Sequence, residues 1–361
     1  MSTTSNQPRI VAFDVARCLA IVGMVIVNYK IILVSGEPGP PWLAAFADAF
    51  TGRAVATFVV LAGIGVSLLS RRGRESGDPE RVRTDRIRLL KRAAFLFVFG
   101  VLYAPIWPAD ILHFYGVYLV IAVLLLNASG RMLWAAAITA MLIFLGLLVT
   151  FDYSAGWEWS TLTYTDFWTA EGFVRHLFFN GFHPVFPWVA FMLVGMWLGR
   201  LDFHDPGVRR RLAVVGAVVV AATELLSWWL KGLITAAPDV DPEAIHLVGT
   251  SPIPPMPLYL LSGGGTAVMV IALVAMLTAR FGDAGWMRPF IAAGQLAFTL
   301  YVAHVVVGIG LLEELDAGSD QTLSFALGYS ALFCVIGILF AWAWRQRFRQ
   351  GPFEWLMRRL T

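Results

Sequence analysis

Ten long apolar stretches separated by short, mostly basic segments limit most strongly how this chain can fold. A helix needs roughly 20 mainly apolar residues to cross a bilayer. Such stretches occur at residues 12–34, 52–70, 92–106, 110–127, 132–151, 184–200, 212–231, 258–280, 289–312 and 323–344. The chain is 58% hydrophobic with a mean hydropathy of +0.71, which is far above the usual apolar share of a soluble domain. We therefore predict an all-α, polytopic integral membrane protein with about ten transmembrane helices.

The lysines and arginines lie almost entirely in alternate connections between these stretches. With a cytoplasmic N-terminus, the segments on the cytoplasmic side hold 23 of the 27 Lys and Arg residues. The other side keeps only Lys30, Arg53, Arg175 and Lys231. Positive residues next to spans stay cytoplasmic, so the pattern predicts that both the N- and C-termini are cytoplasmic.

The net charge of +3 does not indicate a nucleic-acid partner. The basic segment 71–92 has no interleaved aromatic residues of the kind that stack on single strands, and anionic lipid or a phosphorylated cytosolic ligand fits it better. Cys18 and Cys334 both lie in apolar stretches, so neither a disulfide framework nor a thiolate metal cluster is indicated. No sizeable soluble module interrupts the spans, and we expect residues 1–361 to form a single transmembrane domain.

Polar side chains inside spans are informative, because a charge at the bilayer centre costs about 2.5–3.5 kcal/mol on insertion scales. One group is expected in the outer half of the membrane, and it comprises Asn28, Tyr29, Arg53, Asp110, His113, His183 and His304. The i, i+3 spacing of Asp110 and His113 places both on one helix face, where a carboxylate can orient an imidazole.

Histidines are suited to general acid and base catalysis near neutral pH. The alternative for each is a structural hydrogen bond or helix cap, and the depth of His304 within a span favours function. The spacing matches no metal motif, so no metal is expected. His176, His204 and His246 fall in connections and are expected to be solvated.

A second polar group lies toward the cytoplasmic side. Asp14 and Arg17 share a helix face at the start of the first span, where Arg17 either contacts a phosphate or forms a structural ion pair with Asp14. Glu224 is the one acidic residue near the middle of a span. It is either a proton-relay group or a protonated, hydrogen-bonded side chain.

Several motifs occur in a specific order. They are Arg9-Ile-Val-Ala-Phe-Asp14-Val-Ala-Arg17, Ala20-Ile-Val-Gly-Met24, Asn28-Tyr29, Gly52-Arg53, Leu61-Ala-Gly63, Asp110-Ile-Leu-His-Phe-Tyr-Gly116, Pro184-Val-Phe-Pro-Trp188, Leu193-Val-Gly195, Leu198-Gly-Arg200, Ala297-Phe-Thr-Leu-Tyr301, His304 and Arg347-Phe-Arg-Gln-Gly-Pro-Phe-Glu-Trp355. This order resembles the transmembrane acyltransferases related to heparan-alpha-glucosaminide N-acetyltransferase, and within them the bacterial YeiB-like branch. The resemblance covers nearly the whole chain.

The resemblance implies an acyl-CoA-dependent acyltransferase of the plasma membrane. Such an enzyme moves an acyl group, here expected to be acetyl, from cytosolic acyl-CoA to a sugar-type amine or hydroxyl on the other side. It implies His304 or His113 as the base, Asp110 as its orienting group and His183 as a further catalytic candidate.

The same resemblance implies that Arg17, held in place by Asp14, and part of the basic segment 71–92 meet the CoA phosphates, and that Asn28, Tyr29 or Arg53 supplies the oxyanion donor. It also implies contact with membrane lipid and a possible homodimer. The chain departs from the eukaryotic enzyme, whose histidine thought to be catalytic follows the first helix, because residues 31–51 contain no histidine.

Two other functions fit the sequence. A proton-coupled transporter or flippase of a small amphiphile would use the histidines and Glu224 as its binding and coupling site. A non-catalytic membrane scaffold is the third alternative, although a scaffold does not require ionisable groups clustered in one leaflet.

Overall fold

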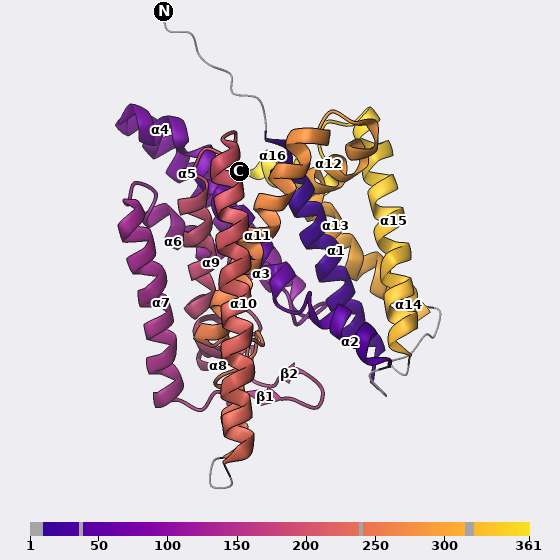
Figure 1. The fold of residues 1–361 in the computed structure, drawn as a ribbon. Coiled ribbons are helices and arrows are strands. Elements are labelled where there is room, and N and C mark those ends of the chain that lie inside the picture. The colour runs from indigo at the N-terminus through magenta and orange to yellow at the C-terminus, as the bar shows by residue number, and fades with distance from the viewer. Residues whose placement is uncertain (1–9, 36–38, 238–240, 315–320) are drawn as a thin grey trace, which may run out of the picture.

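The protein is an assembly of helices that run up and down between two ends of a bundle (Figure 1). The computed structural model describes residues 10–35, 39–237, 241–314 and 321–361. The first half contains α1 (Val11–Leu33), α2 (Pro41–Asp48), α3 (Arg53–Leu69), α4 (Arg71–Ser76), α5 (Pro79–Tyr103), α6 (Leu112–Leu124), α7 (Gly130–Thr150), α8 (Ala170–Arg175) and a π-helical segment at His176–Asn180. Between α7 and α8, β1 (Trp157–Glu158) pairs antiparallel with β2 (Thr163–Tyr164), with Trp157 opposite Tyr164.

The second half of the chain is helical throughout its described residues. It contains α9 (Val185–Leu198), α10 (Pro206–Ala236), a 3₁₀ segment (Pro242–His246), α11 (Pro257–Phe281), a 3₁₀ turn (Gly285–Met287), α12 (Arg288–Gln295), α13 (Ala297–Ala303), a π-helical segment (His304–Ile309), α14 (Gly310–Glu314), α15 (Leu323–Arg347) and α16 (Pro352–Leu360). The segment from α12 to α14 is therefore one helical run, interrupted at Leu296 and by the π-helical segment.

The two ends of the bundle differ in composition. At one end lie the start of α1, the whole of α4 and the short α16, and we call this the basic end (Figure 1). At the opposite end lie α2, the β1–β2 hairpin and α8. The basic connections and the connections with few Lys and Arg residues, which alternate along the sequence, thus lie at opposite ends of the bundle.

The structure confirms an all-α polytopic membrane protein. Among the described residues, seven helices are long and apolar enough to cross a membrane, or up to eight if the bent pair Ala170–Asn180 and Val185–Leu198 is one span. The two stretches outside this set are α5, whose first half is strongly basic, and α6, which has only 13 residues. The count of ten spans and the cytoplasmic location of the termini stay predictions.

Aspartate–proline pairs start two of the helices that leave the basic end, α5 and α10. Asp78 accepts a hydrogen bond from the backbone N–H of Glu80 at 3.0 Å ahead of α5, and Asp205 accepts one from Gly207 at 2.8 Å ahead of α10. A proline follows each cap at the first helical position, where its missing N–H and fixed φ are favourable.

Glycines allow the central helices to approach closely, as is common where lipid removes the hydrophobic drive for helix association. A Cβ on Gly63 of α3 would lie 2.0 Å from the carbonyl oxygen of Met192 in α9. A Cβ on Gly100 of α5 would lie 2.2 Å from the backbone nitrogen of His113. The second contact fixes the depth at which α6 begins.

Candidate functional site

His304 lies at the first position of the π-helical segment that interrupts the α12–α14 run, and it is 1% exposed. Its Nδ1 contacts the backbone carbonyl oxygen of Tyr301. A carbonyl only accepts hydrogen bonds, so Nδ1 carries the hydrogen and, in the neutral ring, Nε2 carries the lone pair. Nε2 lies 2.8 Å from Nδ2 of Asn28 on α1, which donates to it. The arrangement presents Nε2 as a base beside an amide donor.

Asp110 and His113 form a second oriented imidazole at the start of α6, and both are fully buried. His113 Nδ1 lies 3.2 Å from Asp110 Oδ2, which also accepts a hydrogen bond from the backbone N–H of Leu112 at 2.8 Å. Nδ1 is therefore the donor, and Nε2 has no hydrogen-bond partner among the described residues. The i, i+3 contact predicted from the sequence is present.

Tyr301 joins the two imidazoles. Its hydroxyl donates to Asp110 Oδ1 at 2.9 Å, and its backbone carbonyl holds His304. Tyr29 adds a further restraint, because its hydroxyl donates to the backbone carbonyl of His304 at 2.8 Å. We refer to Asn28, Asp110, His113, Tyr301 and His304 as the histidine network.

The mostly buried histidine network lies at the start of α6, a helix shorter than a bilayer is thick. The 13 residues of α6 rise about 20 Å, against a hydrocarbon core of roughly 30 Å. The 14 residues of α9 give about 21 Å. Residues 152–183, which we call the cover segment, close this part of the bundle from the opposite end (Figure 1).

The cover segment is held together around Asn180, which is fully buried. Its Nδ2 donates to the carbonyl oxygens of Tyr153 and Ala155, each at 2.8 Å, and its Oδ1 accepts from the Tyr164 hydroxyl at 2.7 Å. Burial raises the pKa of the Tyr164 hydroxyl, so it remains a donor at neutral pH. The segment is therefore an ordered structure rather than a solvated loop.

The expectation that His176 is solvated is wrong. His176 is 2% exposed, and its ring stacks on that of His113 with centroids 5.7 Å apart. Tyr164 and Phe167 of the cover segment pack against its edges and faces at 4.6 and 5.0 Å. The available sequence signal was the i, i+3, i+4, i+7 spacing of Phe173, His176, Leu177 and Asn180, which is typical of a helix with one packed face.

His183, a further catalytic candidate, lies outside the histidine network. His183 packs against Trp188 with ring centroids 4.7 Å apart, and its backbone carbonyl accepts a hydrogen bond from the Tyr118 hydroxyl at 2.5 Å. Phe114 contacts both the His113 and His183 rings, with centroids 4.0 and 6.1 Å away. His183 is thus a neighbour of the network without a hydrogen bond to it.

Arg53 forms an ion pair with Glu224. Its Nη2 lies 2.6 Å from Glu224 Oε1, which also accepts from the Ser262 hydroxyl at 2.6 Å. The Thr250 hydroxyl donates to Glu224 Oε2 at 3.0 Å. Sequence reasoning did not connect these residues, which come from α3, α10, α11 and the connection between the last two.

At the basic end, Asp14 links α1 to α12. Arg17 Nη1 lies 2.9 Å from Asp14 Oδ1, and Gln295 Nε2 donates to Asp14 Oδ2 at 3.3 Å. Gln295 also lines a pocket of about 700 Å³ that is rich in arginine. Asn28 and Arg17 lie on the same helix about 17 Å apart along its axis.

The chemical capacity of the site is acid–base catalysis. Two imidazoles each have one nitrogen fixed as a donor by an oxygen acceptor, so the other nitrogen carries the lone pair that can take a proton. His113 Nε2 has no partner among the described residues, whereas His304 Nε2 accepts from Asn28 Nδ2. No group of three or more His, Cys, Asp or Glu side chains with metal-binding geometry occurs in the described part of the chain. These features define a polytopic membrane protein with buried acid–base groups between a basic end and a covered opposite end.

Comparison with known families identifies the family to which this membrane protein belongs. The family model described as heparan-alpha-glucosaminide N-acetyltransferase, catalytic, matches residues 9–230, more than half of the chain. The chain therefore belongs to this family, which confirms the resemblance drawn from the motifs. A second model, described as a protein of unknown function (DUF418), matches residues 197–361. Asn28, Asp110 and His113 fall in the first region, and Tyr301 and His304 in the second.

Two bacterial relatives place the chain in the YeiB-like branch. YeiB of Escherichia coli (strain K12), described as uncharacterized, is 24% identical over 98% of this chain and 96% of its own length. YxaH of Bacillus subtilis (strain 168), also described as uncharacterized, is 22% identical over 100% of this chain and 96% of its own length.

Proposed function

We propose that this protein is a plasma-membrane acyltransferase that takes an acyl group, acetyl by analogy with its family, from cytosolic acyl-CoA. The acceptor is a sugar-type amine or hydroxyl on the extracytoplasmic side. The basic end faces the cytoplasm, because nearly all Lys and Arg residues flank the spans there and such residues stay inside. Membership of the N-acetyltransferase family supports the reaction class.

The observation that carries this proposal is the histidine network. His304 Nε2 or His113 Nε2 removes the proton from the acceptor O–H or N–H as that atom attacks the thioester carbonyl. The C–S bond then breaks, the new acyl–O or acyl–N bond remains, and the proton passes to the departing CoA thiolate. Asn28 Nδ2 donates one N–H to His304 Nε2 at 2.8 Å, and its second N–H is the donor we assign to the oxyanion.

The polar residues toward the two ends of α1 suit the two parts of acyl-CoA, its phosphates and its thioester. Arg17 and Asp14 lie near its basic end, and Asn28 lies about 17 Å further along the helix axis. An elongated donor with charged phosphates at one end and a thioester at the other suits this separation. In the proposal, Arg17 attracts the phosphates while Asp14 and Gln295 hold its helix end in place.

Substitution of the two histidines tests the proposal. We expect His304→Ala and His113→Ala to lower the turnover of acetyl-CoA by about a hundredfold or more, since general acid–base catalysis contributes about 10²–10⁴-fold, while calorimetry shows unchanged CoA binding. His246→Ala, on an exposed residue of the Pro242–His246 segment, is the matched control. Normal turnover in both histidine variants would contradict the assignment of the base.

Substitution of Arg17 tests the donor end separately. We expect Arg17→Ala to weaken CoA binding while the bound complex still turns over, because the side chain is remote from the reacting carbonyl. Calorimetric titration of CoA and of CoA without its 3′-phosphate measures the effect. Unchanged affinity would show that Arg17 forms only the ion pair with Asp14.

A further inference from the structure

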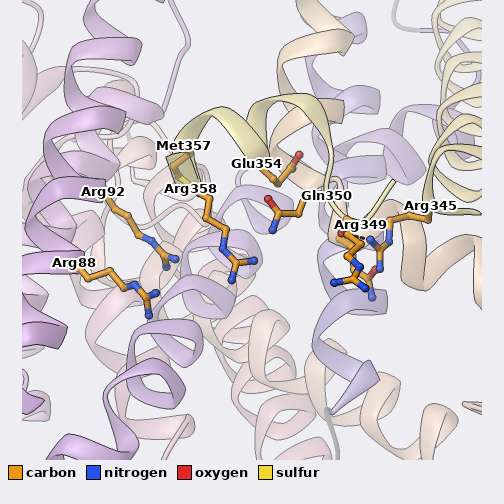
Figure 2. Close-up of a pocket in the computed structure, with 9 residues that line it drawn as sticks. Arg88, Arg92, Arg345, Arg349, Gln350, Glu354, Met357 and Arg358 are labelled. Atoms are coloured by element: carbon orange, nitrogen blue, oxygen red, sulfur yellow. Dashed lines mark hydrogen bonds between the residues drawn. The ribbon is translucent and has the colours of Figure 1, made fainter. Parts of the chain in front are cut away.

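The basic end contains a pocket whose lining is dominated by five arginines. The pocket has a volume of about 700 Å³, and its arginines are Arg88, Arg92, Arg345, Arg349 and Arg358. Figure 2 shows Arg88 and Arg92 reaching from α5 toward Arg358 on α16, with Arg345 and Arg349 on the other side of Gln350. Helix α5 and the C-terminal residues from Arg345 to Arg358, which are far apart in the sequence, therefore place positive charge around one pocket.

The pocket depends on the position of α16, which a specific contact fixes. Glu354 Oε1 accepts hydrogen bonds from the backbone N–H groups of Phe298 and Thr299 at 2.8 and 3.0 Å. Its Oε2 accepts from the Thr299 hydroxyl at 2.5 Å. Glu354 thus caps the N-terminus of α13, where backbone donors are free and negative charge is favourable. The one carboxylate that lines the pocket is committed to this cap.

The five arginines lack ion-pair partners among the described residues. None of the five forms an ion pair with a described carboxylate. The Nε atom of Arg92 is buried without a hydrogen-bond partner. Arg88 and Arg92 are four residues apart on one helix, a spacing at which like charges repel.

We propose that this pocket binds a phosphate ester carrying at least two phosphate groups. Arginine is suited to this ligand, because its planar guanidinium donates two parallel hydrogen bonds to phosphate oxygens. Two or more phosphates match the number and spread of guanidinium groups better than one. Two sources have this chemistry, namely the nucleotide part of acyl-CoA, which rests on the proposed function, and the headgroup of a diphosphate lipid such as cardiolipin.

A contact already described connects the pocket to the donor end of the proposed site. Gln295 lines the pocket and donates to Asp14, which pairs with Arg17. A ligand whose phosphates occupy the pocket would therefore meet the start of α1 next. This connection favours the nucleotide as the source.

The test measures binding to the full chain in nanodiscs of phosphatidylcholine, with pyrophosphate and CoA as probes. We expect Arg92→Gln and Arg358→Gln to raise the dissociation constant of both probes about tenfold or more, since each removes a charge-assisted contact. Arg86→Gln and Arg359→Gln are the controls, because Arg86 is exposed on α5 outside the pocket lining and Arg359 lies over the Trp355 ring. A thermal melt of each variant shows that it is folded.

A lipid arm distinguishes the two sources. Nanodiscs with cardiolipin are examined by native mass spectrometry. Cardiolipin retained by the wild type and the controls but lost from the two pocket variants, with no pyrophosphate binding, would assign the pocket to the lipid and uphold the shared chemistry. Equal binding of pyrophosphate, CoA and cardiolipin by pocket variants and controls would overturn the proposal.

The pocket and the proposed function fail in different ways. Pocket variants with unchanged binding but normal, His304-dependent turnover would overturn the pocket alone. Intact phosphate binding with turnover that does not depend on His304 or His113 would overturn the catalytic proposal alone.

Discussion

At the residue scale, the ion pair between Arg53 and Glu224 offers a test that distinguishes a proton-coupled transporter from an acyltransferase. If Glu224 couples proton movement in a transporter, Glu224→Gln should abolish that movement. The contacts with Arg53, Ser262 and Thr250 instead indicate a structural carboxylate. We therefore expect Glu224→Gln to reduce stability while leaving CoA binding and acyl transfer close to normal.

The stability effect is measured with a double-mutant cycle. The side chains of Arg53 and Glu224 are 18% and 40% exposed, so solvent screening reduces their coupling to about 1 kcal/mol. Arg53→Gln and Glu224→Gln should each lower the thermal midpoint, and the double variant should lower it little further. Fully additive losses would show that the two residues are not coupled.

The sequence predicts contacts between residues that are close along the chain. Asp110 and His113 are three residues apart, so helical geometry alone brings them together, and the depth of His304 marked it as unusual. Tyr301 was not assigned a role because its hydroxyl meets Asp110 across 191 positions of chain. Such a contact depends on how α6 and α13 pack, which no local pattern encodes.

At the element scale, the crossing of α3 and α9 depends on the absence of a side chain at Gly63. A Cβ there would lie 2.0 Å from the Met192 carbonyl oxygen, so the two backbones would have to separate. We expect Gly63→Ala to cost at least the 1–3 kcal/mol or so that is typical of overpacking, seen as a lower thermal midpoint. Gly146→Ala in α7 is the control, since its Cβ would meet nothing within 4 Å. Equal midpoints for the two variants would contradict the tight crossing.

The elements also show where the sequence was insufficient. Apolar length predicted the positions of the long helices well, because length and hydropathy alone define a span. It did not predict that α6 has only 13 residues or that the helical pair Ala170–Asn180 and Val185–Leu198 is bent by 47°.

At the scale of the whole molecule, the orientation in the membrane is testable with introduced cysteines. The native Cys18 is buried and Cys334 is half-buried, and both lie within the spanning helices α1 and α15. We expect a membrane-impermeant maleimide to label Thr161→Cys, in the cover segment, on intact cells. Ser76→Cys, at the basic end, should react only after permeabilisation. The reverse pattern would invert the proposed topology.

The most direct test of the central claim is sided acyl transfer by the protein in sealed liposomes. Labelled acetyl-CoA is supplied on the side of the basic end, and glucosamine, as a probe acceptor, on the opposite side. We predict labelled N-acetylglucosamine on the glucosamine side with the wild-type protein, and background amounts with His304→Ala together with His113→Ala. Equal product from the wild type and this double variant would contradict a catalytic role for the histidine network.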